Sequence, residues 1–183
     1  MTVAVRDAGL SDIPALHAIY AHHVLTGLGT FDETPPSLGA FEEKWRASLG
    51  HGLSWLVAID AGVPVGYAYA SLFRPRRGYR YTVEDSVYIR EDQRKSGVGS
   101  ALLGPLIKRC EALGVRQVVA VIGDSGNVGS IRLHAKHGFK QAGTVVGAGF
   151  KFGRWVDIVL MQRALNGGAN GVPAEGAGWW REP

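Results

Sequence analysis

A glycine loop between a strand and a helix constrains the fold of this chain more than any other segment. The run Arg-Lys-Ser-Gly-Val-Gly-Ser at residues 94–100 follows the strand-like residues 86–89 and opens a helix-like run that ends near Leu113. Gly97 and Gly99 let backbone N–H groups turn toward a ligand, and the N-terminus of the helix adds partial positive charge. The loop therefore predicts a pyrophosphate-binding site; the alternative is a tight turn flanked by solvated basic residues.

Two common nucleotide-binding motifs do not fit this loop. A dinucleotide-binding fold requires Gly-x-Gly-x-x-Gly, but Leu102 stands at the position of the third glycine. A Walker loop requires Gly-x-x-x-x-Gly-Lys-Ser/Thr, and the sequence contains no such run. Neither a Rossmann site nor nucleotide hydrolysis is therefore expected.

Length and composition favour one cytoplasmic domain. A chain of 183 residues buries a core without disulfides, and its single cysteine, Cys110, lies on an apolar helix stripe where we expect inert packing. The N-terminus lacks the pattern of a signal peptide, and no apolar run is long enough to span a bilayer. The net charge of +4 is compatible with acidic ligands but does not select a partner.

The apolar patterns predict a mixed sheet. The fold class is α/β (α+β), with a largely antiparallel central sheet flanked by helices, because strands dominate before residue 90 and strand-helix alternation follows. Residues 1–165 are expected to form the domain, and residues 166–183 a glycine-rich, flexible tail. Pro105, inside a helix pattern, is expected to kink it. Strands are predicted near residues 3–6, 54–59, 65–70, 83–89, 115–122, 139–146 and 155–162, and helices from 11–12 and near 38–50, 98–113 and 130–137.

Three motifs in register resemble the Gcn5-related N-acetyltransferase (GNAT) family. Arg-x-x-Gly-x-Gly at residues 94–99 is similar to its acetyl-CoA pyrophosphate loop, and Asn-x-x-Ser-x-x-Leu-His-x-x-x-Gly-Phe at 127–139 to its segment beside the pantetheine arm. Residues 82–89 and 149–157 are similar to the phosphinothricin and methionine-sulfoximine N-acetyltransferase branch. The resemblance covers residues 3–165 and implies a GNAT-like fold, acetyl-CoA as co-substrate and a homodimer.

Acetyl transfer to an amine needs a proton acceptor for the amine and a proton for the departing thiolate. Glu84 is the expected general base, because it precedes the strand that leads to the loop; a solvated acid or an ion-pair partner is the alternative. Asp85 points to the opposite face of that strand and is the less suitable base. His134 is a second candidate base or a donor to the thiolate, and the alternative is a histidine that packs inside the fold. A metal site with His137 is not expected, since no cysteine or acid stands nearby.

The other predicted cofactor contacts follow from the strand, the loop and the next helix. Backbone groups of residues 87–89 would pair with the pantetheine amides as an added strand would, and one N–H would face the thioester oxygen. Asn127 would bond the same arm or, alternatively, cap a helix. The predicted acetyl-CoA-binding residues are Val87, Tyr88, Ile89, Arg94, Lys95, Ser96, Gly97, Val98, Gly99, Ser100, Asn127 and Ser130.

An arginine-rich loop between two strands is the expected acceptor site. Arg74 and Arg76 offer fork-shaped donors that suit a carboxylate or a phosphinate, and Tyr79 lies in the same loop. The alternatives are a solvated basic loop and contact with a nucleic-acid backbone. Phe31, from an earlier loop, would line the pocket. The resemblance adds Lys151, because it places that region at the acceptor site and the dimer contact.

The predicted function is direct transfer of an acetyl group from acetyl-CoA to the amine of a small amino-acid-like acceptor. Phosphinothricin, methionine sulfoximine and methionine sulfone are the expected types. Alignment of the two substrates contributes about 7–11 kcal/mol in ideal cases, so binding acetyl-CoA is part of catalysis. The alternatives are acetylation of a protein N-terminus, a lysine or an antibiotic amine, and, in another class, a basic nucleic-acid-binding module.

Overall fold

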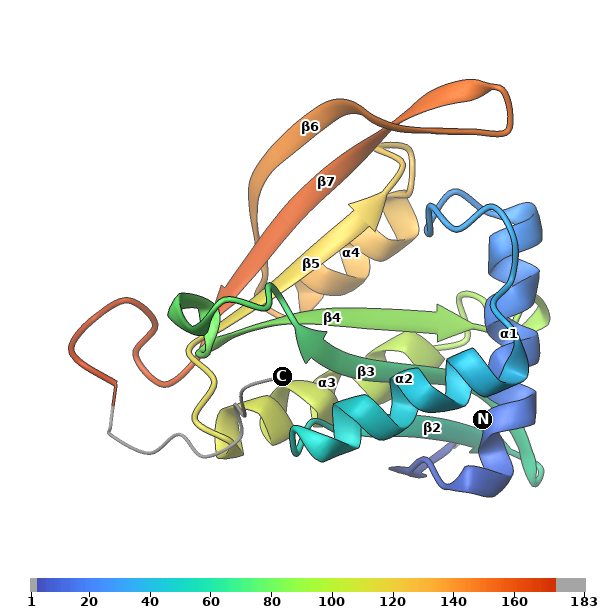
Figure 1. The fold of residues 1–183 in the computed structure, drawn as a ribbon, viewed down its shortest axis with the longest axis horizontal. Coiled ribbons are helices and arrows are strands. Elements are labelled where there is room, and N and C mark those ends of the chain that lie inside the picture. The colour runs from blue at the N-terminus through green and yellow to red at the C-terminus, as the bar shows by residue number, and fades with distance from the viewer. Residues whose placement is uncertain (1–2, 174–183) are drawn as a thin grey trace.

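Seven strands form one sheet in the order β1-β2-β3-β4-β5-β7-β6 in the computed structural model, which describes residues 3–173 (Figure 1). Every neighbouring pair is antiparallel except β4 and β5. This topology confirms the predicted mixed, largely antiparallel sheet with one parallel centre. The strands are β1 (Ala4–Asp7), β2 (Trp55–Asp60), β3 (Val63–Leu72), β4 (Thr82–Ile89), β5 (Gln117–Gly123), β6 (Lys140–Lys151) and β7 (Arg154–Ala164).

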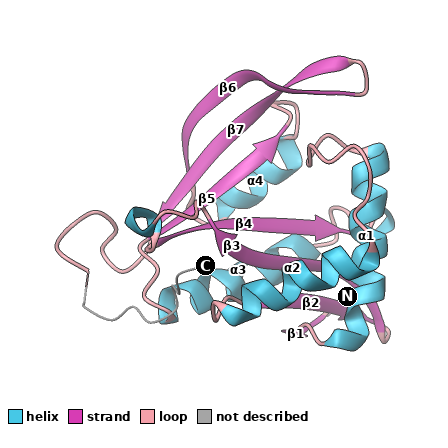
Figure 2. Cartoon of the chain, viewed as in Figure 1, coloured by secondary structure: helices cyan, strands magenta, loops and turns pink. Residues whose placement is uncertain are grey.

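Helices cover both faces of the sheet (Figure 2). The first two helices pack on one face, and the third and fourth on the other. They are α1 (Ile13–Thr26), α2 (Leu38–Gly50), α3 (Val98–Ala112) and α4 (Val128–Lys136), with short 3-10 turns η1 (Leu10–Asp12), η2 (Arg77–Tyr79) and η3 (Glu91–Gln93). Each predicted helix is present, and the bounds of α2 agree with the prediction.

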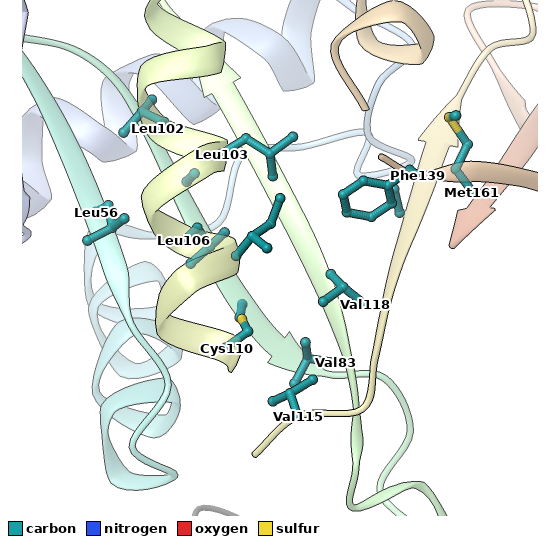
Figure 3. Close-up of a cluster of buried hydrophobic side chains, with 14 of the residues drawn as sticks. Leu56, Val83, Leu102, Leu103, Leu106, Cys110, Val115, Val118, Phe139 and Met161 are labelled. Carbon is teal, nitrogen blue, oxygen red and sulfur yellow. The ribbon is translucent and has the colours of Figure 1, made fainter. Parts of the chain in front are cut away.

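The two faces of the sheet carry different cores, because successive side chains of a strand point to opposite faces. The α3 face is aliphatic, with Leu56 and Val83 against the helix (Figure 3). The face toward α1 and α2 is aromatic: the Trp55 ring stacks on the Tyr69 ring with centroids 4.0 Å apart. The α3 residues Val98, Leu102, Leu106 and Cys110 are buried, and α3 continues through Pro105.

β6 and β7 are longer than the sequence pattern predicted. They form a hairpin that projects beyond the rest of the sheet (Figure 1). Its two-residue turn has positive φ angles at Phe152 and Gly153, as a type I′ hairpin turn requires. The strands were underestimated because their outer halves carry exposed apolar residues and glycines without a regular alternation.

The start of the predicted C-terminal tail contacts the domain. The Asn166 side-chain amide donates to the carbonyls of Glu111 and Val115, and the Arg116 guanidinium donates to the carbonyls of Gly168 and Asn170. Residues 166–170 are therefore bonded to the end of α3 and to the loop between α3 and β5. Residues 174–183 of the predicted tail lie outside the described residues.

Candidate active site

The parallel strands β4 and β5 diverge in the middle of the sheet. They pair only between residues 82–85 and 117–120, although β4 continues to Ile89 and β5 to Gly123 (Figure 1). β3 still pairs with β4 as far as Ile89, so the edge of residues 86–89 that faces β5 lacks a strand partner. An open edge of this kind accepts an extended amide-containing ligand. Of the predicted pantetheine-binding residues, Val87 and Ile89 turn their backbone groups toward this edge and Tyr88 turns its own toward β3; the Ile89 carbonyl lies 2.8 Å from Nε2 of His23.

The glycine loop lies directly beyond the end of β4. Gly97 has φ +93°, in the left-handed region, and a Cβ there would meet open space, so the glycine is required by the turn. Behind it, the first amides of α3 have no partners within the helix and face outward with the positive end of its dipole. Arg94 pairs with Glu91 at 3.0 Å while both stay exposed. The backbone and these charges suit a pyrophosphate.

Other loop residues serve the protein itself. A Cβ on Gly99 would lie 3.0 Å from the Leu133 side chain, so this glycine allows α3 and α4 to pack closely. The hydroxyl of Ser96 donates to the Gln93 carbonyl at 2.6 Å, and the hydroxyl of Ser100 lies 2.8 Å from Nε2 of His137. Ligand contacts of residues 98–100 would therefore use the backbone.

Asn127 caps α4, which was the alternative to direct cofactor contact. Its Oδ1 accepts a hydrogen bond from the backbone N–H of Ser130 at 3.2 Å, and its Nδ2 donates to the Gly123 carbonyl at 3.4 Å. The cap fixes the start of α4 at the end of β5. Asn127 and Ser130, both predicted to contact the cofactor, therefore lie at the β5 side of the gap between β4 and β5, whereas the glycine loop lies at the β4 side.

Glu84 and Asp85 point to opposite faces of β4, as predicted. Glu84 is half-buried on the aromatic face, while Asp85 is buried on the α3 face. Burial raises the pKa of Glu84, Asp85 raises it further, and the charges of Arg74 and Lys44 lower it. The net shift is upward, which brings this carboxyl closer to the range that suits a general base near neutral pH.

His134 lies on the Asp85 side of the sheet and does not meet Glu84. Its Nε2 is 2.9 Å from Oδ2 of Asp85, its Nδ1 is 2.8 Å from the Ser130 carbonyl, and the ring is 4% exposed. This arrangement matches the alternative of a histidine packed inside the fold. The predicted catalytic role would require one of these two hydrogen bonds to break. Cys110 is nearby, and burial together with Asp85 raises the pKa of its thiol to about 12, as expected for inert core.

The arginine-rich loop after β3 brings one arginine to Glu84. The guanidinium of Arg74 lies 4.4 Å from the Phe73 ring centroid and lowers the pKa of Glu84. Tyr79 packs edge-on against the same ring at 5.7 Å and is partly exposed. Arg76 precedes η2 and accepts a backbone hydrogen bond from Tyr79. Arg74, Phe73 and Tyr79 therefore form one exposed wall beside Glu84.

The loop between α1 and α2 reaches the site from the β6 side. The Phe31 ring packs on Gly149, where a Cβ would lie 2.4 Å from it. Lys151, predicted to bind the acceptor, is 1% exposed, and its ammonium donates to the carbonyls of Gly27 and Thr30 at 3.0 and 2.8 Å. Lys151 therefore anchors the loop that carries Phe31.

The family model described as the acetyltransferase (GNAT) family matches residues 16–139. The chain belongs to this family. It is 52% identical over 169 residues to the phosphinothricin N-acetyltransferase of Alcaligenes faecalis, covering 92% of this chain and 84% of that protein. It is 43% identical over 167 residues to the L-methionine sulfoximine/L-methionine sulfone acetyltransferase of Pseudomonas paraeruginosa, covering 91% of this chain and 96% of that protein.

A solved structure also resembles this GNAT acetyltransferase closely. The acetyl-CoA complex of a GNAT superfamily phosphinothricin acetyltransferase from Sinorhizobium meliloti has a TM-score of 0.93 and 44% identity, covering 96% of this chain and 95% of that one. The predicted family, fold class and enzyme class are thus confirmed. Within residues 3–173, no helix is long and apolar enough to cross a membrane, and no three metal-ligating side chains cluster.

Sequence reasoning missed two hydrogen-bonded pairs of polar side chains of this acetyltransferase at the aromatic face. The Lys44 ammonium donates to the Tyr69 hydroxyl at 2.7 Å, and the Tyr20 hydroxyl donates to Oδ2 of Asp32 at 2.6 Å. Tyr69 was detectable, because it alternates with Ala68 on a predicted strand and so shares the face of Tyr67. Lys44 stands three residues after the buried Phe41 of α2, a spacing that places it at the inner edge of that helix.

Replacing Lys151 by Met tests how the loop is anchored. The variant keeps the buried volume but leaves two carbonyls unpaired, so we expect unfolding to cost about 1–3 kcal/mol less. The KM for the acceptor should rise while the KM for acetyl-CoA stays unchanged, since the loop carries Phe31. Urea unfolding and steady-state kinetics measure both, with Lys140→Met at an exposed position of β6 as control. An unchanged acceptor KM would contradict a role of the anchored loop in acceptor binding.

Proposed function

We propose that this acetyltransferase transfers the acetyl group of acetyl-CoA directly to the amine of a small amino-acid-like acceptor. The observation that carries the proposal is the open edge of β4 at residues 86–89, which lies between Glu84, still paired with β5, and the glycine loop. One ligand binds along this edge and another meets it at Glu84. The relatives named for phosphinothricin and for methionine sulfoximine or methionine sulfone support acceptors of these types.

In this proposal the chain contributes binding, orientation and one proton acceptor. Backbone groups of residues 87–89 hold the pantetheine amides, and the start of α3 with Arg94 and Lys95 holds the pyrophosphate. An N–H of the open edge faces the thioester oxygen and stabilises the negative charge that develops there. Acetyl-CoA supplies the activated acetyl group. The amide C–N bond forms as the thioester C–S bond breaks; Glu84 takes the proton that the amine loses, and CoA leaves as a thiolate that takes a proton from water.

Arg74 is assigned to the acceptor carboxylate. Its guanidinium acts on Glu84 from the exposed wall, and an α-carboxylate shares one carbon with the reacting amine. A planar guanidinium suits a carboxylate because it donates two parallel hydrogen bonds. Arg76 and Tyr79 of the same loop, with Phe31 opposite, complete the proposed acceptor site. Lys151 contributes through the position of the loop.

Release of CoA tests the proposed function. The purified chain should release CoA from acetyl-CoA with phosphinothricin, methionine sulfoximine or methionine sulfone, and mass spectrometry should find the N-acetyl product. Binding of acetyl-CoA raises the apparent thermal stability whether or not an acceptor reacts. Acetyl-CoA binding without release for any of these acceptors would overturn the acceptor class. Peptides with free N-termini, lysine peptides and amine antibiotics are the comparison panel.

A homodimer in the cytoplasm completes the proposal. The projecting β6–β7 hairpin exposes large apolar side chains, with Trp155 70% and Val146 81% exposed, and such patches mark interaction surfaces. We expect light scattering to give twice the mass of one chain. Trp155→Ser should shift the chain toward monomer, whereas Leu25→Ser, at an exposed position of α1, should not. A monomeric wild-type chain would contradict the dimer. Resistance of cells to phosphinothricin is the expected consequence of the activity.

A further inference from the structure

Lys44 brings a second positive charge to the acceptor side of the sheet. α2 crosses the aromatic face (Figure 1), and its Lys44 ammonium lies 4.9 Å from the Tyr69 ring centroid and 5.9 Å from that of Tyr20. The ammonium donates to the Tyr69 hydroxyl at 2.7 Å. That hydroxyl accepts this bond, so its own proton is available to another acceptor. The lysine remains exposed, so a small molecule reaches it from solvent.

No carboxylate within residues 3–173 forms an ion pair with Lys44. Other cations of the described chain, such as Arg46 and Arg90, have acidic partners on the surface. The Lys44 ammonium instead lies between solvent and the aromatic face, against the rings of Tyr69 and Tyr20. The Lys44 ammonium is therefore available to pair with a negatively charged group of the substrate.

The separation between Glu84 and Tyr69 along the strands indicates which part of the acceptor reaches Lys44. On β3 and β4 the cross-strand pairs of this face are Ser71 with Glu84 and Tyr69 with Ser86, so Tyr69 stands one pair farther along than Glu84. One such step measures about 7 Å along a strand. An acceptor amine at Glu84 keeps its α-carboxylate next to it, near Arg74. The end of its side chain, several bonds away, reaches Lys44 and Tyr69.

We propose that Lys44 and the Tyr69 hydroxyl bind an anionic group at the end of the acceptor side chain, such as a phosphinate. This inference rests on the proposed function and narrows its substrate class. Phosphinothricin ends in an anionic methylphosphinate, and methionine sulfone ends in a neutral methylsulfone of the same shape. Both carry the same α-amine and α-carboxylate. Lys44 therefore favours the phosphinate over the sulfone.

The test compares these two acceptors in one set of variants. Lys44→Gln should lower kcat/KM for phosphinothricin by about ten- to a hundredfold, the range for a lost charge-assisted hydrogen bond. It should leave kcat/KM for methionine sulfone nearly unchanged. Lys44→Arg should keep most of the preference, and Tyr69→Phe, which retains the ring stacked on Trp55, should lose part of it. Lys108→Gln, at an exposed position of α3, is the matched control.

Each result decides between distinct readings. Equal losses for both acceptors would mean that Lys44 acts through the shared carboxylate or through its charge on Glu84, and would overturn the side-chain assignment. No loss for either acceptor would overturn any role of Lys44, while the proposed function would stand. Failure of the wild-type chain to acetylate either compound would overturn the proposed function and this inference together. A thermal midpoint of Lys44→Gln equal to that of wild type shows that the fold is intact.

Discussion

Glu84→Gln should lower kcat by about a hundred- to ten-thousandfold, the usual contribution of a positioned general base. The amide keeps the size of the side chain but does not accept the amine proton. In the proposed function acetyl-CoA binds along the backbone of residues 87–89 and the glycine loop, away from the Glu84 carboxyl, so its affinity should stay as in wild type. A loss in kcat with unchanged cofactor affinity identifies an interaction made in the transition state.

The pH profile of kcat separates a base from a structural carboxyl. Burial has the largest effect on the pKa of Glu84 and raises it. The charge of Arg74 has the next largest effect and lowers it, and the net shift is upward. A general base accepts a proton only when it is ionised, so if Glu84 is the proposed base, kcat of the wild type should fall as the pH drops through this raised pKa. Glu84→Gln should lose that limb and keep the limb that belongs to the acceptor amine. An unchanged profile in the variant would reject Glu84 as the base.

Glu43→Gln is the matched control for this prediction. Glu43 is an exposed acid on α2, close in sequence to Lys44. The control should keep both kcat and its acidic limb. If Glu43→Gln lowered kcat as much as Glu84→Gln, the loss would come from removing a negative charge near the acceptor site and not from losing the proton acceptor.

Local patterns of the sequence predicted the strands, the helices and the loop that position the site. The glycine loop was predictable because a turn at Gly97 needs a positive φ, and the opposite orientation of Glu84 and Asp85 followed from the alternation of strand side chains. The divergence of β4 and β5 was not predictable. It depends on where pairing between two strands stops, and no residue type marks that position.

Contacts between distant segments explain the remaining differences. Lys151 was assigned to the acceptor from its position in a motif, but its ammonium reaches the carbonyls of Gly27 and Thr30, more than a hundred residues earlier. Lys44 was missed for the same reason, because Tyr69 lies on another element. A sequence shows which charges a segment carries, and tertiary packing decides which of them a ligand meets.

The buried pair of Asp85 and His134 should control stability in a pH-dependent way. Burial lowers the pKa of His134, but its hydrogen bond to Asp85, the charge of Asp85 and the Ser130 carbonyl outweigh it and raise the pKa above its usual value. A group whose pKa is raised on folding stabilises the fold fully below its unfolded pKa. That contribution is lost as the pH rises through the folded pKa.

Asp85→Asn removes the counter-charge of a buried imidazolium. We expect it to lower the free energy of unfolding by about 3–5 kcal/mol near pH 6, as for other broken buried pairs. The loss should shrink as the pH rises past the raised pKa of His134, because a neutral imidazole needs no counter-charge and can hydrogen-bond to the Asn side chain. Asp7→Asn, which removes a surface pair with Arg109, should cost at most about 1 kcal/mol.

Urea unfolding of both variants and the wild type at about pH 6 and about pH 9 measures this difference, on either side of the histidine titration. A loss of equal size at both values would mean that Asp85 acts through packing or neutral hydrogen bonds. The pair stands where β4 and β5 stop pairing, since Asp85 is the last β4 residue in register with β5. Loosening it should therefore also weaken acetyl-CoA binding along the open edge, while Asp7→Asn leaves that affinity unchanged.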